Sequence, residues 1–150
     1  MYFVDRSKIS NTLTYMKSIV QLIEKSPDLT SSELGKLALE RSAQNIIESI
    51  VDVGNSMIDG FIMRDPGSYD DIIDILTDEK VITPEMDAPL KEVLALRKML
   101  VRDFMSVDHQ QVASVIQTNL AVLKKFPDNI ERYLTHELGP VSAFLPEDQG

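Results

Sequence analysis

The chain is built around residues 84–108, PEMDAPLKEVLALRKMLVRDFMSVD. Thr83 and Pro84 form a strong helix start, because a capping side chain is followed by proline at the first helical position. Near Ser106 the helical pattern breaks. Between these points the apolar residues recur at the three- and four-residue spacing of a helix with a wide apolar face, and they are Leu90, Val93, Leu94, Leu96, Met99, Leu100, Val101 and Phe104.

Two arginines, Arg97 and Arg102, lie five positions apart in this stretch. On an ideal helix with about 100° per residue they are roughly 140° apart, so they border the apolar face. One interpretation is structural, with each arginine paired to Asp103, Asp108 or a carboxylate on another helix. The other is an anion site, because two planar and permanently charged guanidinium groups suit a phosphate or a carboxylate. The spacing leaves both interpretations open.

The sequence on both sides of this stretch contains further helical patterns and no strand ladder. Capping signals at Asp5, at Thr30 with Glu33, at Ser68 and at Asp108 predict helices over residues 5–25, 30–61, 68–76 and 109–137. Pro127 should kink or split the last of these, because proline cannot donate the helical hydrogen bond. We therefore predict an all-α, antiparallel bundle of four to five helices in residues 1–137, followed by an irregular C-terminal tail, residues 138–150.

The predicted helix over residues 30–61 carries two stripes. The first is apolar and indicates a central helix of the bundle, with Leu37, Ala43, Ile46, Ile47, Ile50, Val51, Gly54, Met57, Ile58 and Phe61. The second is polar and repeats at steps of three and four, with Arg41, Asn45, Glu48, Asp52, Asn55 and Asp59. Such a stripe is typical of a solvated face. Because apolar residues flank it on both sides, part of it could instead line a cleft or a subunit interface. There Glu48 and Asp52 would meet the arginines as salt bridges or as the polar wall of a site.

The composition excludes several kinds of site. The 150-residue chain has no cysteine, so thiolate catalysis and cysteine-ligated metals are ruled out. Its two histidines, His109 and His136, lie too far apart to indicate a metal site, and we expect neither metal nor cofactor. The 24 acidic and 15 basic residues give a net charge of −9, which disfavours a diffuse nucleic-acid or membrane surface. No signal peptide or apolar membrane span is visible, and a cytoplasmic protein is expected.

Four short patterns occur in a recognisable order along the chain. They are Val4, Asp5, Lys8 and Ile9 in the first predicted helix, Ala38 and Arg41 in the second, Ser68, Tyr69 and Leu76 in the third, and the Leu96-to-Asp108 segment. By these residues the chain resembles, over nearly its whole length, the HepT-like ribonuclease toxins of the HEPN superfamily.

The resemblance implies a helical bundle that forms a homodimer. In such a dimer two copies of an Arg-x4-His-x-Tyr motif would face each other across a cleft and act as a metal-independent endoribonuclease. It also implies a partner, a nucleotidyltransferase antitoxin that silences the toxin by adding nucleotides to the motif tyrosine. The chemistry is consistent with these residue types, since histidine can move the proton of the RNA 2′-hydroxyl and arginine can stabilise charge on the phosphate.

This chain departs from the motif at two positions. Arg97 matches the family arginine, but Arg102 stands at the histidine position and Phe104 at the tyrosine position. Arginine, with a pKa above about 12, cannot readily exchange a proton near neutral pH, and Phe104 lacks the hydroxyl that an antitoxin would modify. His109 is the other candidate proton carrier. The plainer interpretation of His109 is a residue in the first turn of a helix, exposed to solvent.

Three hypotheses follow from the sequence. The leading one is a HepT-like dimer whose cleft binds an anion, RNA or a nucleotide through Arg97 and Arg102, with Arg41 as a contributor, and whose ribonuclease activity is reduced or lost. The second is an active endoribonuclease toxin. The third is a structural interaction module in which the arginines pair with Glu48 or Asp52 and lock the dimer.

Overall fold

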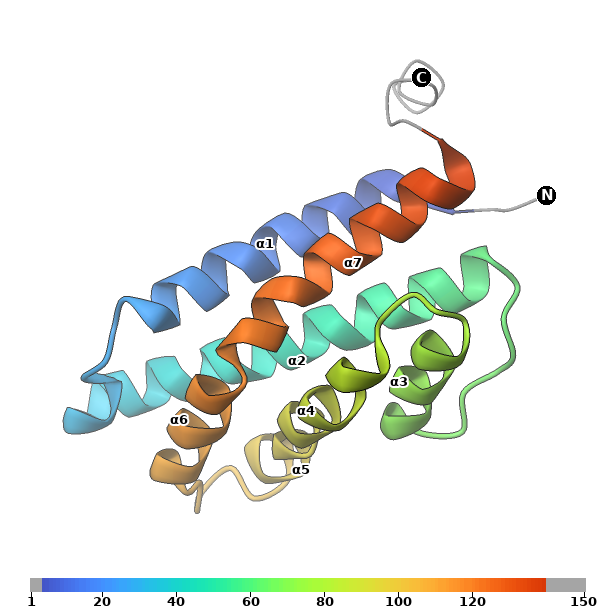
Figure 1. The fold of residues 1–150 in the computed structure, drawn as a ribbon. Helices are drawn as coiled ribbons and strands as arrows, with labels where there is room; N and C mark the ends of the chain where they lie inside the picture. Colours follow the sequence, from blue (N-terminus) through green and yellow to red (C-terminus); the bar gives the residue numbers. More distant parts are fainter. Residues whose placement is uncertain (1–3, 140–150) are drawn as a thin grey trace.

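Helices joined by short connections make up the computed structural model, which describes residues 4–139 (Figure 1). Most of the predicted tail therefore lies outside the described residues. The α-helices are α1 (Arg6–Glu24), α2 (Glu33–Gly60), α3 (Tyr69–Asp78), α4 (Pro84–Leu94), α5 (Leu96–Val101), α6 (His109–Thr118) and α7 (Leu120–Leu138), and a short 3-10 helix, η1, spans Leu29–Ser31. Within residues 4–139 there is no β-strand. The predicted all-α class is confirmed.

The long helix α2 occupies the centre of this arrangement. It contacts α1, α3, α5 and α6, while α7 packs against α1 and α4. In Figure 1, α1 runs along one side of α2, and α3, α4 and α5 lie on the other side, while α7 lies beside α1 and crosses in front of α2 towards α6. No helix among the described residues has both the length and the apolar character needed to cross a bilayer.

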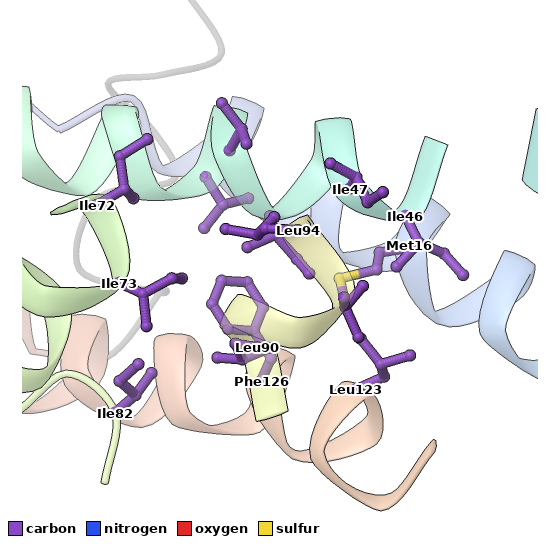
Figure 2. Packing of buried hydrophobic residues seen from close by; sticks show 14 of the residues in the cluster. Met16, Ile46, Ile47, Ile72, Ile73, Ile82, Leu90, Leu94, Leu123 and Phe126 are labelled. Carbon is purple, nitrogen blue, oxygen red and sulfur yellow. The ribbon is translucent and has the colours of Figure 1, made fainter. Parts of the chain in front are cut away.

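The core lies between α2 and the helices around it. Figure 2 shows Ile46 and Ile47 of α2, Leu90 and Leu94 of α4, and Phe126 of α7 converging on this core. Phe126, Ile46 and Leu90 are fully buried, and each such side chain contributes about 1.5–3 kcal/mol through the hydrophobic effect. Nine of the ten apolar residues predicted for the second helix are buried; the tenth, Leu37, is 59% exposed.

The predicted helix beginning at Pro84 is divided and ends earlier than expected. It breaks at Ala95, whose ψ of −20° departs from the α-helical value, and α5 ends at Val101 with Arg102 as its C-cap. Val101 and Phe104 were predicted for the apolar face, yet they are 38% and 61% exposed. Helix packing explains why both side chains are exposed. Because α6 packs on α2, the chain must reverse direction between α5 and α6.

The predicted helix over residues 109–137 breaks at Asn119 and not at Pro127. The Asn119 amide donates hydrogen bonds to Glu92 Oε1 at 2.6 Å and to the Val115 carbonyl at 2.8 Å, and these contacts stabilise the bend. Pro127 is buried inside α7, which continues to Leu138. The packing of this helix overrides the local preference of proline. The C-cap of this helix is Gly139, with a φ of 84°, two residues beyond the predicted end at 137.

Of the five predicted N-caps, three form their side-chain hydrogen bonds, Thr83 takes the N-cap position without one, and Thr30 is wrong. Asp5, Ser68 and Asp108 each accept a hydrogen bond from the backbone N–H three residues later. At α2 the cap is Ser32, which accepts from the Gly35 N–H at 2.9 Å. Thr30 belongs to η1 instead, so the capping box predicted from Thr30 and Glu33 does not form.

Candidate functional site

Arg97 is held between two other helices by its charge and by its flat guanidinium group. Its Nε–H donates to Glu48 Oε1 of α2 at 3.0 Å. Its guanidinium carbon lies 4.6 Å from the centre of the Tyr69 ring, at the start of α3. This is the geometry of a cation–π contact. The Arg97 side chain nevertheless keeps 29% of its surface exposed, so it is fixed in position and still reachable from solvent.

A pocket of about 440 Å³ opens beside Arg97, where the start of α3 meets the end of α4 and α5. Three of its lining side chains are cations, and Asp70 is its one carboxylate. Lys98 and Arg102 make no side-chain ion pair within the described part of the chain. The full lining is Ser68, Tyr69, Asp70, Leu94, Ala95, Arg97, Lys98 and Arg102. Both motif arginines therefore line one pocket.

The loop before α3 fixes the wall of this pocket. Asp71 accepts two hydrogen bonds from Arg64, at 2.8 Å each, and a third from the Gly67 N–H at 2.8 Å. The Arg64 hydrogen bonds, followed by that of Gly67, lower the pKa of the Asp71 carboxyl to about 2. The ion pair thus holds the turn that leads into Ser68 and Tyr69.

A second, polar pocket of about 420 Å³ lies on the other side of the Arg97–Glu48 contact, between α1 and α2. Three members of the polar stripe of α2, namely Asn45, Glu48 and Asp52, line it together with Asn11, Thr12, Tyr15 and Ser49. The Asn45 amide donates to the Tyr15 hydroxyl at 2.7 Å. Part of the stripe thus lines a cleft, whereas Arg41, Asn55 and Asp59 are exposed.

The other sequence-derived candidates lie apart from the Arg97 pocket. Arg41 is seven residues before Glu48 on α2, which is about 10 Å along the helix axis. Asp52 lines only the second pocket. Phe104 lies in the connection between α5 and α6 at 61% exposure, beside Met105 at 89%. The pocket residues that the motif did not identify are Lys98 and Asp70, since nothing in their spacing distinguishes them from other surface charges.

His109 pairs with a carboxylate outside the Arg97 pocket. Its Nε2 lies 2.6 Å from Glu40 Oε2, and the two side chains are 20% and 21% exposed. The expectation of a solvated first-turn histidine is therefore corrected. Glu40 precedes Glu48 by eight residues on α2, or about 12 Å along the axis, so His109 is remote from the Arg97 contact in this chain.

Comparisons with known proteins identify a family and several solved structures that this chain resembles. A family model described as "Ribonuclease HepT-like" matches residues 9–130. A protein of Bacillus subtilis (strain 168) named "Putative RNase YutE" is 51% identical over 144 residues, covering 96% of this chain and 99% of that one. The solved structure of YutE, described as a cytosolic protein of unknown function, superposes with a TM-score of 0.92 over 96% of this chain and 100% of that chain.

More distant solved structures share the fold. A toxin–antitoxin with AMP-PNP matches with a TM-score of 0.71 at 21% identity, over 81% of this chain and 96% of that one. A tri-AMPylated HEPN toxin of Shewanella oneidensis in complex with its MNT antitoxin matches with a TM-score of 0.73 at 21% identity, over 83% and 96%. At this identity the likeness establishes the helical architecture.

Proposed function

We propose that this chain, which belongs to the ribonuclease HepT-like family, binds single-stranded RNA at the Arg97 pocket and has reduced or lost ribonuclease activity. The observation that carries the proposal is the gathering of Arg97, Lys98 and Arg102 around one pocket. In a chain of net charge −9, such a local excess of cations defines a place where a polyanion can bind.

The pocket offers both components of single-strand recognition. Lys98 and Arg102, which have no carboxylate partner among residues 4–139, are available to phosphate oxygens. Tyr69 is 43% exposed next to them and presents an aromatic surface on which a base can stack. Stacking requires an unpaired base, which favours a single strand over a duplex.

The same pocket lacks an evident means of moving a proton. Histidine ordinarily supplies this step near neutral pH, and no histidine lines the pocket. His109 pairs with Glu40 at a distance from Arg97. Removing general acid–base catalysis costs about 10²- to 10⁴-fold in rate, so binding without efficient cleavage is the expected activity.

The deciding experiment measures binding and cleavage of a fluorescent single-stranded RNA in chelator-containing buffer. We expect saturable binding that Arg97→Gln and Arg102→Gln each weaken about tenfold, corresponding to about 1.4 kcal/mol. Lys125→Gln is the matched control, because Lys125 is an exposed cation on α7 that lines none of the pockets described above. RNA binding that is absent, or insensitive to both arginine substitutions, would reject the proposal.

An active endoribonuclease is the competing enzyme hypothesis. Metal-free cleavage that both Arg97→Ala and His109→Ala abolish would establish it with His109 as the proton carrier. Absence of cleavage at high protein excess would remove it. If cleavage survives His109→Ala but not Arg97→Ala, a proton carrier other than His109 operates at the pocket.

The Arg97–Glu48 contact favours a second, structural function. In a purely structural module the arginines would stabilise helix packing and a homodimer without binding RNA. Arg102→Ala would then shift the monomer–dimer equilibrium in sedimentation while RNA binding stays absent. The exposed apolar side chains of Val101, Phe104 and Met105, next to Arg102, support a contact surface for a second copy.

We propose two further properties. The first is a nucleotidyltransferase antitoxin as partner, supported by the toxin–antitoxin complexes that share the fold. Phe104 excludes modification at the motif tyrosine position, so such a partner would act by binding. The second is a cytoplasmic location, supported by the cytosolic description of YutE.

A further inference from the structure

We propose that a third pocket, between the α3–α4 connection and α7, binds a small phosphate monoester. The pocket measures about 260 Å³ and is lined by Lys80, Val81, Ile82, Thr83, Asn129, Arg132, Tyr133 and His136. It lies at the opposite end of α4 from the Arg97 pocket, which includes Leu94. The eleven residues from Thr83 to Leu94 place the two about 16 Å apart along the helix axis.

The helix α7 presents one face to this pocket. Asn129, Arg132, Tyr133 and His136 follow one another at i, i+3, i+4 and i+7, the spacing of a single helical face. The buried residues of the same helix, such as Phe126 and Ile130, fix its rotation. The polar residues of this face are therefore held towards the α3–α4 connection.

The opposite wall is a short segment held in place by two core residues. Val81 and Ile82 are each 2% exposed, and Figure 2 shows Ile82 directed towards the core near Ile73. Immediately before them Lys80 adopts a φ of 62°, an uncommon conformation for a residue with a side chain. This left-handed turn ends α3, because the Lys80 N–H donates to the Thr77 carbonyl at 3.0 Å and the Val81 N–H donates to the Leu76 carbonyl at 2.9 Å. The anchored segment places Lys80 beside the face of α7.

The charges around the pocket have one sign. Two cations, Lys80 and Arg132, line it together with His136, and no carboxylate does. Within residues 4–139 neither Lys80 nor Arg132 forms an ion pair, and His136 approaches only its neighbour Glu137, at 3.7 Å. The chain has 24 acidic residues, yet the two cations that line this pocket have no carboxylate partner among residues 4–139. The pocket therefore favours an anionic ligand. A dianionic phosphate fits it better than a neutral ligand.

Two uncharged polar groups point to an ester with a further hydroxyl group. Asn129 is only 9% exposed, lines the pocket, and makes no side-chain hydrogen bond within the described part of the chain. Its amide, which offers two N–H donors and a carbonyl acceptor, is therefore free to bond a ligand group. Thr83 begins α4 without a capping hydrogen bond from its side chain, so its hydroxyl is also available. The volume lies below the usual range of about 300–1,000 Å³ and indicates a small ligand.

The test uses the full chain and titrates it with glycerol 3-phosphate, inorganic phosphate and glycerol, followed by amide chemical shifts and calorimetry. We expect glycerol 3-phosphate to bind most tightly and to shift amides in residues 80–83 and 129–136. Arg132→Gln and Lys80→Gln should each weaken it about tenfold. Lys125→Gln, which makes the same charge change on the same helix outside the pocket, should change affinity less than about twofold.

The remaining measurements distinguish the phosphate-monoester proposal from its alternatives. Asn129→Leu keeps the branching and the number of heavy atoms of the side chain but removes its polar groups, and it should weaken glycerol 3-phosphate more than inorganic phosphate. Equal affinity for the two phosphates would reject the ester. Binding lost in Arg102→Gln but retained in Arg132→Gln would assign the phosphate to the Arg97 pocket and overturn the proposed site at Arg132. Absence of saturable binding up to about 10 mM would overturn it as well. None of these outcomes depends on whether the chain binds RNA.

Discussion

Arg97 donates its Nε–H to Glu48 at 3.0 Å, and this ion pair lies at the boundary between two pockets, one lined by Arg97 and the other by Glu48. The contact joins α5 to the central helix α2 and holds the guanidinium over Tyr69. It supplies the restraint that a positioned phosphate ligand needs, and it also offsets part of the charge that would attract one.

Glu48→Gln separates these two effects. Because both partners of the ion pair are partly exposed, its loss should lower the free energy of unfolding by less than about 1 kcal/mol. RNA affinity should rise, because removing the carboxylate adds one unit of positive charge beside the pocket. Chemical denaturation and fluorescence anisotropy measure the two quantities. A fall in affinity would mean that Glu48 acts by holding Arg97 in place, or contacts the RNA itself.

Arg102→Gln and Arg41→Gln test how local the RNA site is. Both arginines are exposed, but only Arg102 lines the pocket. If Arg102 contacts one phosphate of a single strand, its loss should reduce the slope of log affinity against log salt by about 0.7. Arg41→Gln should leave that slope nearly unchanged. Equal slopes for the two variants would indicate a diffuse attraction instead of a pocket.

Asp71→Asn should remove a pH-dependent part of the stability. The Arg64 hydrogen bonds, and then the Gly67 N–H, lower the pKa of Asp71 to about 2 in the folded chain. With an unfolded pKa of about 3.9, the stabilisation is complete above that value and is lost as the pH falls through about 2. Urea unfolding should show a constant deficit for Asp71→Asn above about pH 5 that vanishes near pH 2. A deficit that persists at pH 2 would assign it to packing.

Gly54→Ala tests the close approach of α2 and α3. A Cβ at this position would lie 2.5 Å from Ile72 Cγ2. Alanine improves helix propensity by about 1 kcal/mol, but overpacking costs about 1–3 kcal/mol, so we expect a net loss of stability of up to about 2 kcal/mol. Gly67→Ala, with its nearest contact at 3.7 Å, is the control and should lie within about 0.5 kcal/mol of the wild type. Stabilisation by Gly54→Ala would show that Ile72 moves aside.

Individual elements show how far local sequence predicts this fold. The N-caps Asp5, Ser68 and Asp108 are read correctly because each signal lies within three residues of the hydrogen bond it makes. Apolar periodicity also identifies eight of the twelve buried residues of α2, although it misses the buried Leu39 and Val53. The same rule misplaces Val101 and Phe104, because periodicity continues for a few residues beyond the point where the chain turns towards α6. Whether a helix continues depends on what it packs against.

The Arg97 pocket and the pocket lined by Arg132 and His136 could not be derived from residue spacing in the same way. Arg97 and Arg102 are about 140° apart on an ideal helix, and they line one pocket together with the start of α3, which comes from a distant part of the sequence. The face of α7 that carries Arg132 and His136 is an ordinary polar face until the α3–α4 connection is placed beside it. Residues from separate helices meet through packing, which no local pattern contains.

The sequence by itself determined the all-α class, the apolar face of the central helix and the substitution of Arg102 and Phe104 at the motif positions, since each depends on residue identity or local periodicity. Only the tertiary structure decided that Arg97 pairs with Glu48 and that His109 pairs with Glu40. It also decided where the cations without carboxylate partners lie. Long-range ion pairs depend on helix packing, and packing is set by the shared core that the helices bury together.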